Sequence, residues 1–173
     1  EAAAPALRAA GQAFATETAI ESSFHWGWLT VVPSIALWDD QTWHEISERQ
    51  LTRARQVGAL ARLPIDLISV ALTCAWRGEF AAAESAIAEL GVVTEVTGTA
   101  IAPFNALHLA ALRGREGELR ALATETTAYA AARGLGNCAH WTHWVTALLC
   151  NGLARYDDAQ PAAEQAIQGQ SDA

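Results

Sequence analysis

Apolar residues recur at every third or fourth position along most of this chain, which is the spacing of an amphipathic α-helix. Each such helix is expected to bury its apolar face against a neighbour. One predicted buried face consists of Ile65, Ile68, Leu72, Ala75 and Trp76. Four further faces share this spacing: Trp43, Ile46, Gln50, Ala54 and Val57; Ala83, Ala86, Ile87, Leu90 and Val93; Leu119, Leu122, Ala123, Thr126, Tyr129 and Ala130; and Trp141, Trp144, Val145, Leu148 and Leu149.

Residues that typically end or begin helices divide this pattern into nine predicted helices. Gly58, Gly98, Gly134 and Gly136 stand where the glycine of a C-terminal cap is expected. Asp39 or Asp40 can cap a helix that begins near residue 41. The predicted ranges are 3–20, 23–37, 41–58, 65–77, 80–97, 101–113, 115–133, 139–153 and 156–168. Residues 92–101 are rich in β-branched side chains and allow a strand as an alternative, although a lone strand has no partner. The predicted fold class is all-α.

A short motif recurs in the predicted turns between helices. Gly78-Glu79-Phe80 fits the turn of a tetratricopeptide hairpin, Ala154-Arg155-Tyr156 fits it again, and Gly114-Arg115-Glu116 is a poorer copy. The first residues of these copies are 36 and 40 positions apart. Since one hairpin cannot bury its apolar face alone, we expect an array of antiparallel helical hairpins, a tetratricopeptide-like solenoid. An irregular helical bundle is the alternative.

The repeats predict one continuous domain over residues 41–173. Residues 1–40 are rich in tryptophan and show no repeat, so we interpret them as N-terminal helices that cap the end of the array. Whether they instead form part of the array is open at this point.

Charge and composition exclude several classes of function. The formal net charge is −8, so this segment is not expected to contact nucleic acid directly, since phosphate binding needs a basic face. Every basic residue other than histidine is an arginine, which excludes a Walker A lysine and Schiff-base chemistry. No apolar run is long enough to span a membrane, and three cysteines without a C-x-x-C pair indicate a reduced, cytoplasmic protein.

Candidate chemical groups are better explained by structural roles. Ligand-type side chains gather near the end of the chain: Cys138, His140, His143 and Cys150. Their spacing matches no standard zinc site. The paired acids at 39–40 and 157–158 stand at predicted helix starts, where capping explains them. We therefore assign no catalytic residues, no cofactor-binding residues and no metal ligands, and expect neither a cofactor nor enzymatic activity.

The repeat register predicts a groove on the concave face of the array. It aligns Ile68, Phe104 and Trp144 in one column and Leu72, His108 and Leu148 in the next, with Asn151 near the same surface. Such a groove is apolar, with His108 and Asn151 as its polar groups. We expect it to bind a protein partner or a small-molecule effector.

Several short motifs, in this order, carry a resemblance to a known family. They are Ala36-Leu37-Trp38-Asp39-Asp40, Arg53-Ala54-Arg55-Gln56-Val57-Gly58-Ala59-Leu60, Gly78-Glu79-Phe80-Ala81-Ala82-Ala83, Thr94-Glu95-Val96-Thr97-Gly98, Ala110-Ala111-Leu112-Arg113-Gly114-Arg115-Glu116, Arg133-Gly134-Leu135-Gly136 and Asn151-Gly152-Leu153-Ala154-Arg155-Tyr156-Asp157-Asp158-Ala159. The chain resembles the helical, tetratricopeptide-like region of large LuxR-type transcriptional regulators, the MalT-like, ATPase-containing class of actinobacteria.

The resemblance implies a function that composition and spacing do not show by themselves. In that family an ATPase domain lies upstream and a helix-turn-helix DNA reader lies downstream, and neither is present in this sequence. The chain is then expected to be a non-catalytic sensing or protein-interaction segment that couples a ligand or partner to the DNA-binding activity of its parent. Self-association is left open. The alternative is a stand-alone helical scaffold that binds a protein partner.

Overall fold

The computed structural model describes residues 3–9, 31 and 33–168, and all regular structure in these residues is helical. The all-α prediction is therefore confirmed, while its arrangement as a solenoid stays a prediction. The helices bounded by described residues are α3 (Asp40–Gln56), α4 (Leu63–Trp76), α5 (Phe80–Thr97), α6 (Phe104–Leu112), α7 (Glu116–Arg133), α8 (Gly136–Gly152) and α9 (Tyr156–Gln168). Most of the predicted helices 3–20 and 23–37 lies outside the described residues. The alternative strand at 92–101 is wrong, because α5 is helical to Thr97.

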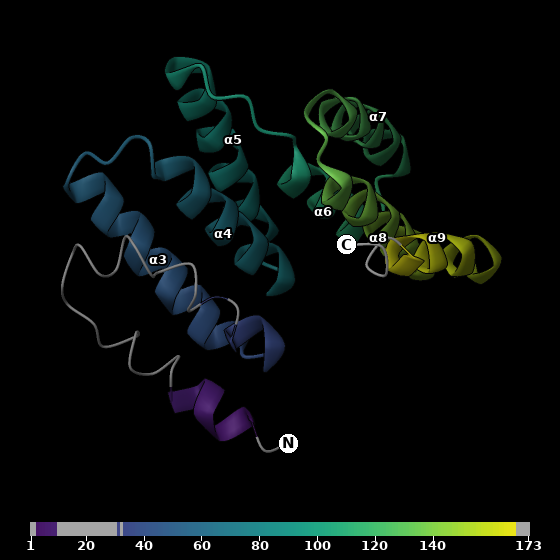
Figure 1. Cartoon of the computed structure of the whole chain (residues 1–173), viewed down its shortest axis with the longest axis horizontal. Helices are drawn as coiled ribbons and strands as arrows, with labels where there is room; N and C mark the ends of the chain where they lie inside the picture. The colour runs from purple at the N-terminus through teal and green to yellow at the C-terminus, as the bar shows by residue number, and fades with distance from the viewer. Residues whose placement is uncertain (1–2, 10–30, 32, 169–173) are drawn as a thin grey trace. The chain divides into compact units, whose positions relative to one another are not determined.

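The chain divides into two compact units, residues 1–99 and 100–173. In the first unit α4 lies between α3 and α5 and packs against both (Figure 1). In the second unit α6 packs against α7 and α8, α7 packs against α8, and α9 packs against α8. Each unit is thus built from neighbouring helices that follow one another in the sequence.

The core of the first unit lies between the three helices. Its members are Ile46, Leu51 and Ala54 of α3, Leu63, Leu67, Val70, Ala71, Cys74 and Ala75 of α4, and Ala83 and Ala86 of α5. The predicted buried face of α4 is wrong at two positions, since Ile65 is 54% exposed and Trp76 is 38% exposed, whereas Ala75 is buried. Because α4 is apolar around most of its circumference and is covered on two sides, its sequence contains no single stripe that marks the buried side.

The core of the second unit joins α6, α7 and α8. It consists of Leu107, Ala110, Ala111, Leu119, Val145 and Leu149, with Leu122, Ala123, Trp141, Trp144 and Leu148 packed against it. The faces predicted on α7 and α8 therefore supply this core. Leu119 and Ala130 of α7 and Val145 and Leu149 of α8 are buried, as their spacing predicted.

The three predicted hairpin turns have the same backbone geometry. Gly78, Gly114 and Ala154 all adopt the left-handed conformation, with φ of 77°, 68° and 57°. The amide of the following residue donates to the carbonyl five positions earlier, at 2.8 Å in all three turns. The left-handed residue itself donates to the carbonyl three positions earlier. This pair of bonds is the Schellman cap of a helix, and the same pair follows α3 at Gly58 and α5 at Gly98.

A fourth copy of this turn precedes α3. Trp38 has φ of 54°, its amide donates to the carbonyl of Ile35, and the amide of Asp39 donates to the carbonyl of Ser34 at 2.9 Å. Trp38 lies 40 positions before Gly78. The end of the segment interpreted as a cap thus carries the same turn as the repeats. The boundary between residues 1–40 and 41–173 stays a prediction.

Candidate functional site

The predicted groove residues lie in both units. Ile68 and Leu72 belong to α4 of the first unit, and both are partly buried. The other five lie in the second unit on two helices that pack together: Phe104 and His108 on α6, and Trp144, Leu148 and Asn151 on α8. Phe104, Trp144 and Leu148 are partly buried, whereas Asn151 is exposed. Within the second unit, the predicted residues of α6 and α8 are therefore on adjacent helices.

His108 occupies the centre of an aromatic cluster. Its ring centroid lies 5.3 Å from that of Trp144 and 5.8 Å from that of Trp141, and the two indoles are 4.9 Å apart. The side chain is wholly buried, and burial lowers the pKa of His108 to about 4, so the ring is neutral at pH 7. A wholly buried imidazole presents no atom to an open groove, so the predicted role of His108 as an exposed polar group does not fit its burial.

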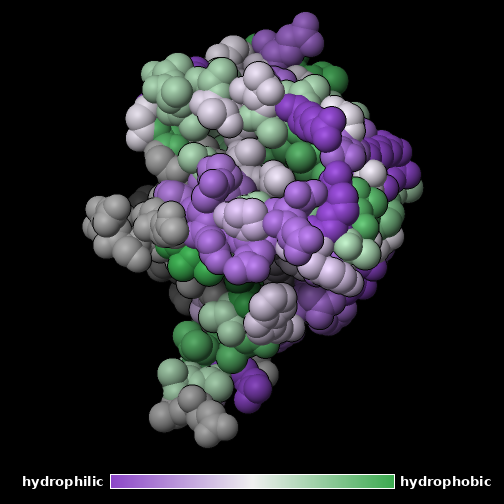
Figure 2. Space-filling view, turned by 90° about the vertical axis from the view of Figure 1, so that its right-hand side faces the viewer, coloured by the Kyte–Doolittle hydropathy of each residue, from purple (hydrophilic) through white to green (hydrophobic). Residues whose placement is uncertain are grey.

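One side of the surface is shown in Figure 2, the side on which α7 and α9 lie in Figure 1. Hydrophilic and apolar residues are both exposed on it. Large exposed apolar side chains elsewhere include Trp38 and Trp76 in the first unit. These two indoles meet edge to face at 6.4 Å, and Trp38 is 84% exposed. An exposed aromatic pair of this kind is typical of binding surfaces.

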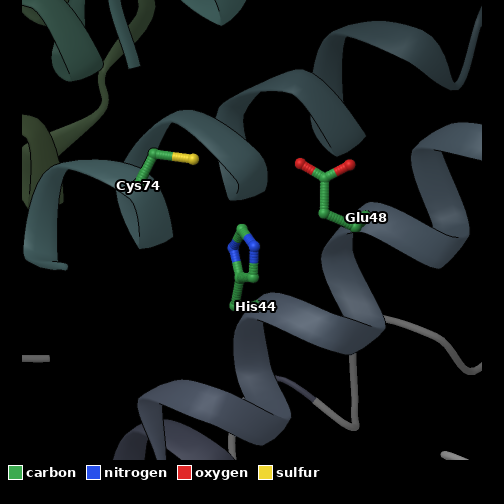
Figure 3. Close-up of side chains that lie close together, drawn as sticks. All are labelled: His44, Glu48 and Cys74. Carbon is green, nitrogen blue, oxygen red and sulfur yellow. The ribbon is translucent and has the colours of Figure 1, made fainter. Parts of the chain in front are cut away.

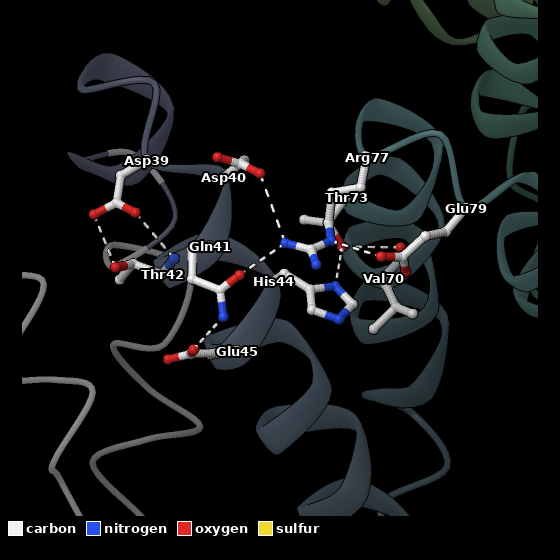
Figure 4. A network of polar contacts seen from close by, with 10 residues as sticks. All are labelled: Asp39, Asp40, Gln41, Thr42, His44, Glu45, Val70, Thr73, Arg77 and Glu79. Carbon is white, nitrogen blue, oxygen red and sulfur yellow. Dashed lines mark hydrogen bonds and ion pairs between the residues drawn. The ribbon is translucent and has the colours of Figure 1, made fainter.

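A polar network ties the start of α3 to the turn between α4 and α5 (Figure 4). Arg77 donates to Gln41 at 2.9 Å and pairs with Glu79 at 2.9 Å and with Asp40 at 3.6 Å. The hydrogen bond from Arg77 lowers the pKa of Glu79. Asp39 accepts from the amide of Thr42 at 3.0 Å, which confirms the predicted helix cap.

Beside this network lie three ligand-type side chains that the sequence analysis missed. His44 and Glu48 stand one turn apart on α3, and Cys74 faces them from α4 (Figure 3). One ring nitrogen, one carboxylate oxygen and the thiol sulfur all lie within 4.8 Å of one another. Burial, followed by the charges of Glu79 and Glu48, raises the pKa of the Cys74 thiol. The available signal was the i, i+4 spacing of His44 and Glu48, which places both on one helix face.

The ligand-type residues near the end of the chain do not form such a group. Among the described side chains, His140, His143 and Cys150 belong to no cluster that could hold an ion. The side chain of Cys138 lies outside the described part. Cys150 is buried instead, with its sulfur 3.7 Å from a guanidinium nitrogen of Arg155.

Comparisons with known proteins found no match: no family model, no curated protein and no solved structure resembles the chain. In the part of the chain that the structure describes, no helix has both the length and the apolar character needed to cross a membrane.

Proposed function

We propose that this chain is a non-catalytic, hairpin-repeat segment that binds a protein partner or small-molecule effector for a LuxR-type transcriptional regulator. The turn repeated at Trp38, Gly78, Gly114 and Ala154 is the observation that carries the proposal. Repeat proteins stack helical hairpins that have equivalent turns, and their stacked helices present extended surfaces for binding. The order of the sequence motifs supports the assignment to a regulator.

The surface of the second unit offers a place for the partner. Phe104, Trp144 and Leu148 are apolar and only partly buried, and the exposed amide of Asn151 lies one turn beyond Leu148 on α8. Large aromatic residues beside a few polar groups are the usual composition of a binding site. The net charge of −8 favours a protein or a small molecule over a nucleic acid as the bound species.

The gene that encodes this chain tests the proposal directly. A P-loop coding segment upstream and a helix-turn-helix segment downstream are the expected result. Stop codons close to both ends would refute the regulator and leave a stand-alone scaffold.

Variants of the full regulator then test the surface. Asn151→Arg adds bulk and charge at an exposed position and is expected to abolish the transcriptional response while leaving the helical circular dichroism unchanged. Thr127→Arg, at an exposed position of α7, is the matched control. A response that survives Asn151→Arg, or that Thr127→Arg removes equally, would show that this surface of α8 does not bind the signal.

A further inference from the structure

Three side chains with metal-binding chemistry meet between α3 and α4 in the first unit (Figure 3). His44 and Glu48 come from successive turns of α3, and Cys74 is a buried residue in the last turn of α4. Their three ligand atoms lie within 4.8 Å of one another. Cys74 is fixed by burial, whereas His44 and Glu48 are only partly buried and have room to adjust.

We propose that His44, Glu48 and Cys74 bind a divalent transition-metal ion, with Zn²⁺ as the best fit and a water molecule in the fourth position. Zinc takes nitrogen, sulfur and oxygen ligands at about 2.0–2.3 Å in a tetrahedron, so its ligand atoms lie about 3.4–3.6 Å apart. The three ligand atoms reach these distances from one another if they move by about 1 Å. Rotation of the side chains of His44 and Glu48 supplies this movement. The donor set also excludes Mg²⁺ and Ca²⁺, which prefer oxygen ligands.

The hydrogen bonds of His44 prepare its ring for a metal. Nδ1 of His44 lies 3.2 Å from the hydroxyl oxygen of Thr73 (Figure 4). That hydroxyl donates its own proton to the carbonyl of Val70 at 3.0 Å, so its oxygen accepts from Nδ1–H of His44. The tautomer that makes this bond carries its proton on Nδ1 and has its lone pair on Nε2. A hydrogen bond that fixes one ring nitrogen and leaves the other to the metal is usual for zinc-binding histidines.

The charges around Cys74 favour a bound cation. Glu48 and Glu79 both place negative charge near its sulfur. Glu79 is already paired with Arg77. A carboxylate oxygen of Glu48 lies within 4.8 Å of both other ligand atoms. A bound cation would offset both carboxylates and stabilise the thiolate that coordinates it.

This site would act as a cross-link between α3 and α4, beside the turns at Trp38 and Gly78. It does not depend on the proposed function: the gene on either side of the chain decides whether a regulator contains this segment, and metal titration decides whether the site exists.

The test is titration of the whole chain, first treated with a chelator, with ZnCl₂ against a chromogenic zinc indicator. One ion per chain with a Kd of about 1 μM or below is expected. With CoCl₂ in place of zinc, a thiolate-to-cobalt charge-transfer band and the intense visible bands of a tetrahedral complex are expected. A cobalt complex without the thiolate band would overturn the proposal, because Cys74 would not be a ligand.

Variants distinguish this site from other histidines and cysteines of the chain. Cys74→Ser and His44→Ala should each weaken zinc binding by at least about tenfold, as the loss of a ligand does. Glu48 is partly exposed, and glutamine has nearly the same shape as glutamate, so Glu48→Gln should leave the packing unchanged. This variant therefore tests the site even if Cys74→Ser disturbs the core. His143→Ala and Cys150→Ser are the matched controls, with the same residue types in the second unit. Zinc binding that survives His44→Ala and Glu48→Gln, or that the controls weaken equally, would overturn the proposal.

Discussion

Gly78 allows the repeated turn to be tested without disturbing any side-chain contact. Its φ is 77°, and a Cβ atom added there would meet nothing within 4 Å. The effect of Gly78→Ala therefore comes from the backbone alone. Gly91 is a matched control in the same unit: it lies inside α5, and an added Cβ would again meet nothing within 4 Å. The same substitution at the two positions differs only in the backbone conformation that alanine must adopt.

The two substitutions are expected to change the free energy of unfolding in opposite directions. The left-handed conformation costs an L-residue about 1–2 kcal/mol. Alanine recovers about 0.4–1 kcal/mol by restricting the unfolded chain. Gly78→Ala should therefore destabilise the protein by about 1 kcal/mol. Gly91→Ala should stabilise it by about 0.5–1 kcal/mol, because alanine is favoured inside a helix.

Thermal and urea unfolding followed by far-ultraviolet circular dichroism measure this difference. For a chain of this size 1 kcal/mol shifts Tm by about 2–4 °C, so the two variants should differ by about 3–8 °C. If Gly78→Ala were as stable as the parent, residue 78 would not be left-handed, and its equivalence to Gly114 and Ala154 would fail. If Gly91→Ala were destabilising, α5 would not run as a regular helix through residue 91.

Three further predictions follow from the same geometry. Ala154→Gly, which relieves a left-handed alanine at φ 57°, should raise the free energy of unfolding by up to about 1 kcal/mol in urea titration, and a loss of stability would contradict the left-handed conformation of residue 154. Leu67→Ala, at a wholly buried position, should cost about 2–5 kcal/mol, whereas Ile65→Ala should cost about 0.5 kcal/mol or less in the same assay; equal losses would contradict the buried face of α4. The pKa of His108 is about 4 in the folded chain and near 6.5 in the unfolded chain. The neutral ring therefore contributes its full share to the free energy of unfolding above pH 6.5. That share, about 3 kcal/mol in total, is lost as the pH falls toward 4. His108→Phe should remove this part of the pH dependence measured by urea unfolding at several pH values, and an unchanged slope would show that His108 is not its source.

The helices were predictable because their signals are local. Residues 80–97 were predicted and observed as one helix, since apolar spacing defines its length and Gly98 ends it with a left-handed cap. The turn at Trp38 was not predictable in this way. Tryptophan has no preference for the left-handed conformation, so only the surrounding hydrogen bonds reveal that residue 38 occupies the place of Gly78.

The sites depended on contacts between distant residues, which a single sequence does not contain. His108 falls in the register of a concave surface, yet Trp141 and Trp144 cover its ring and make it part of the core. The cluster of His44, Glu48 and Cys74 requires α3 to lie beside α4 in one particular rotation. The sequence fixes that rotation poorly, because α4 is apolar on several sides.

The left-handed residues connect these observations, because they occur at nearly constant intervals through both units. Within residues 33–168 they are Trp38, Gly58, Gly78, Gly98, Gly114, Gly134 and Ala154. Five of the six intervals are 20 residues, and the one between Gly98 and Gly114 is 16. One helix with its turn is therefore the elementary unit, and a hairpin normally spans 40 residues, which is longer than the ~34 of a tetratricopeptide repeat.

The short interval contains α6, which has only nine residues and begins the second unit. Four missing residues correspond to a rotation of about 400°, or one turn and a further ~40°. A helix that is four residues shorter therefore has its apolar face turned by only about 40°. α6 is nine residues shorter than α7: the interval accounts for four of these, and most of the rest lies in the longer connection at residues 99–103. α6 still buries Leu107 and Ala110 in the same core as Leu119. The repeat thus tolerates a change of length when the change is close to one helical turn, and a change of two residues in α6 would instead direct those side chains away from the core.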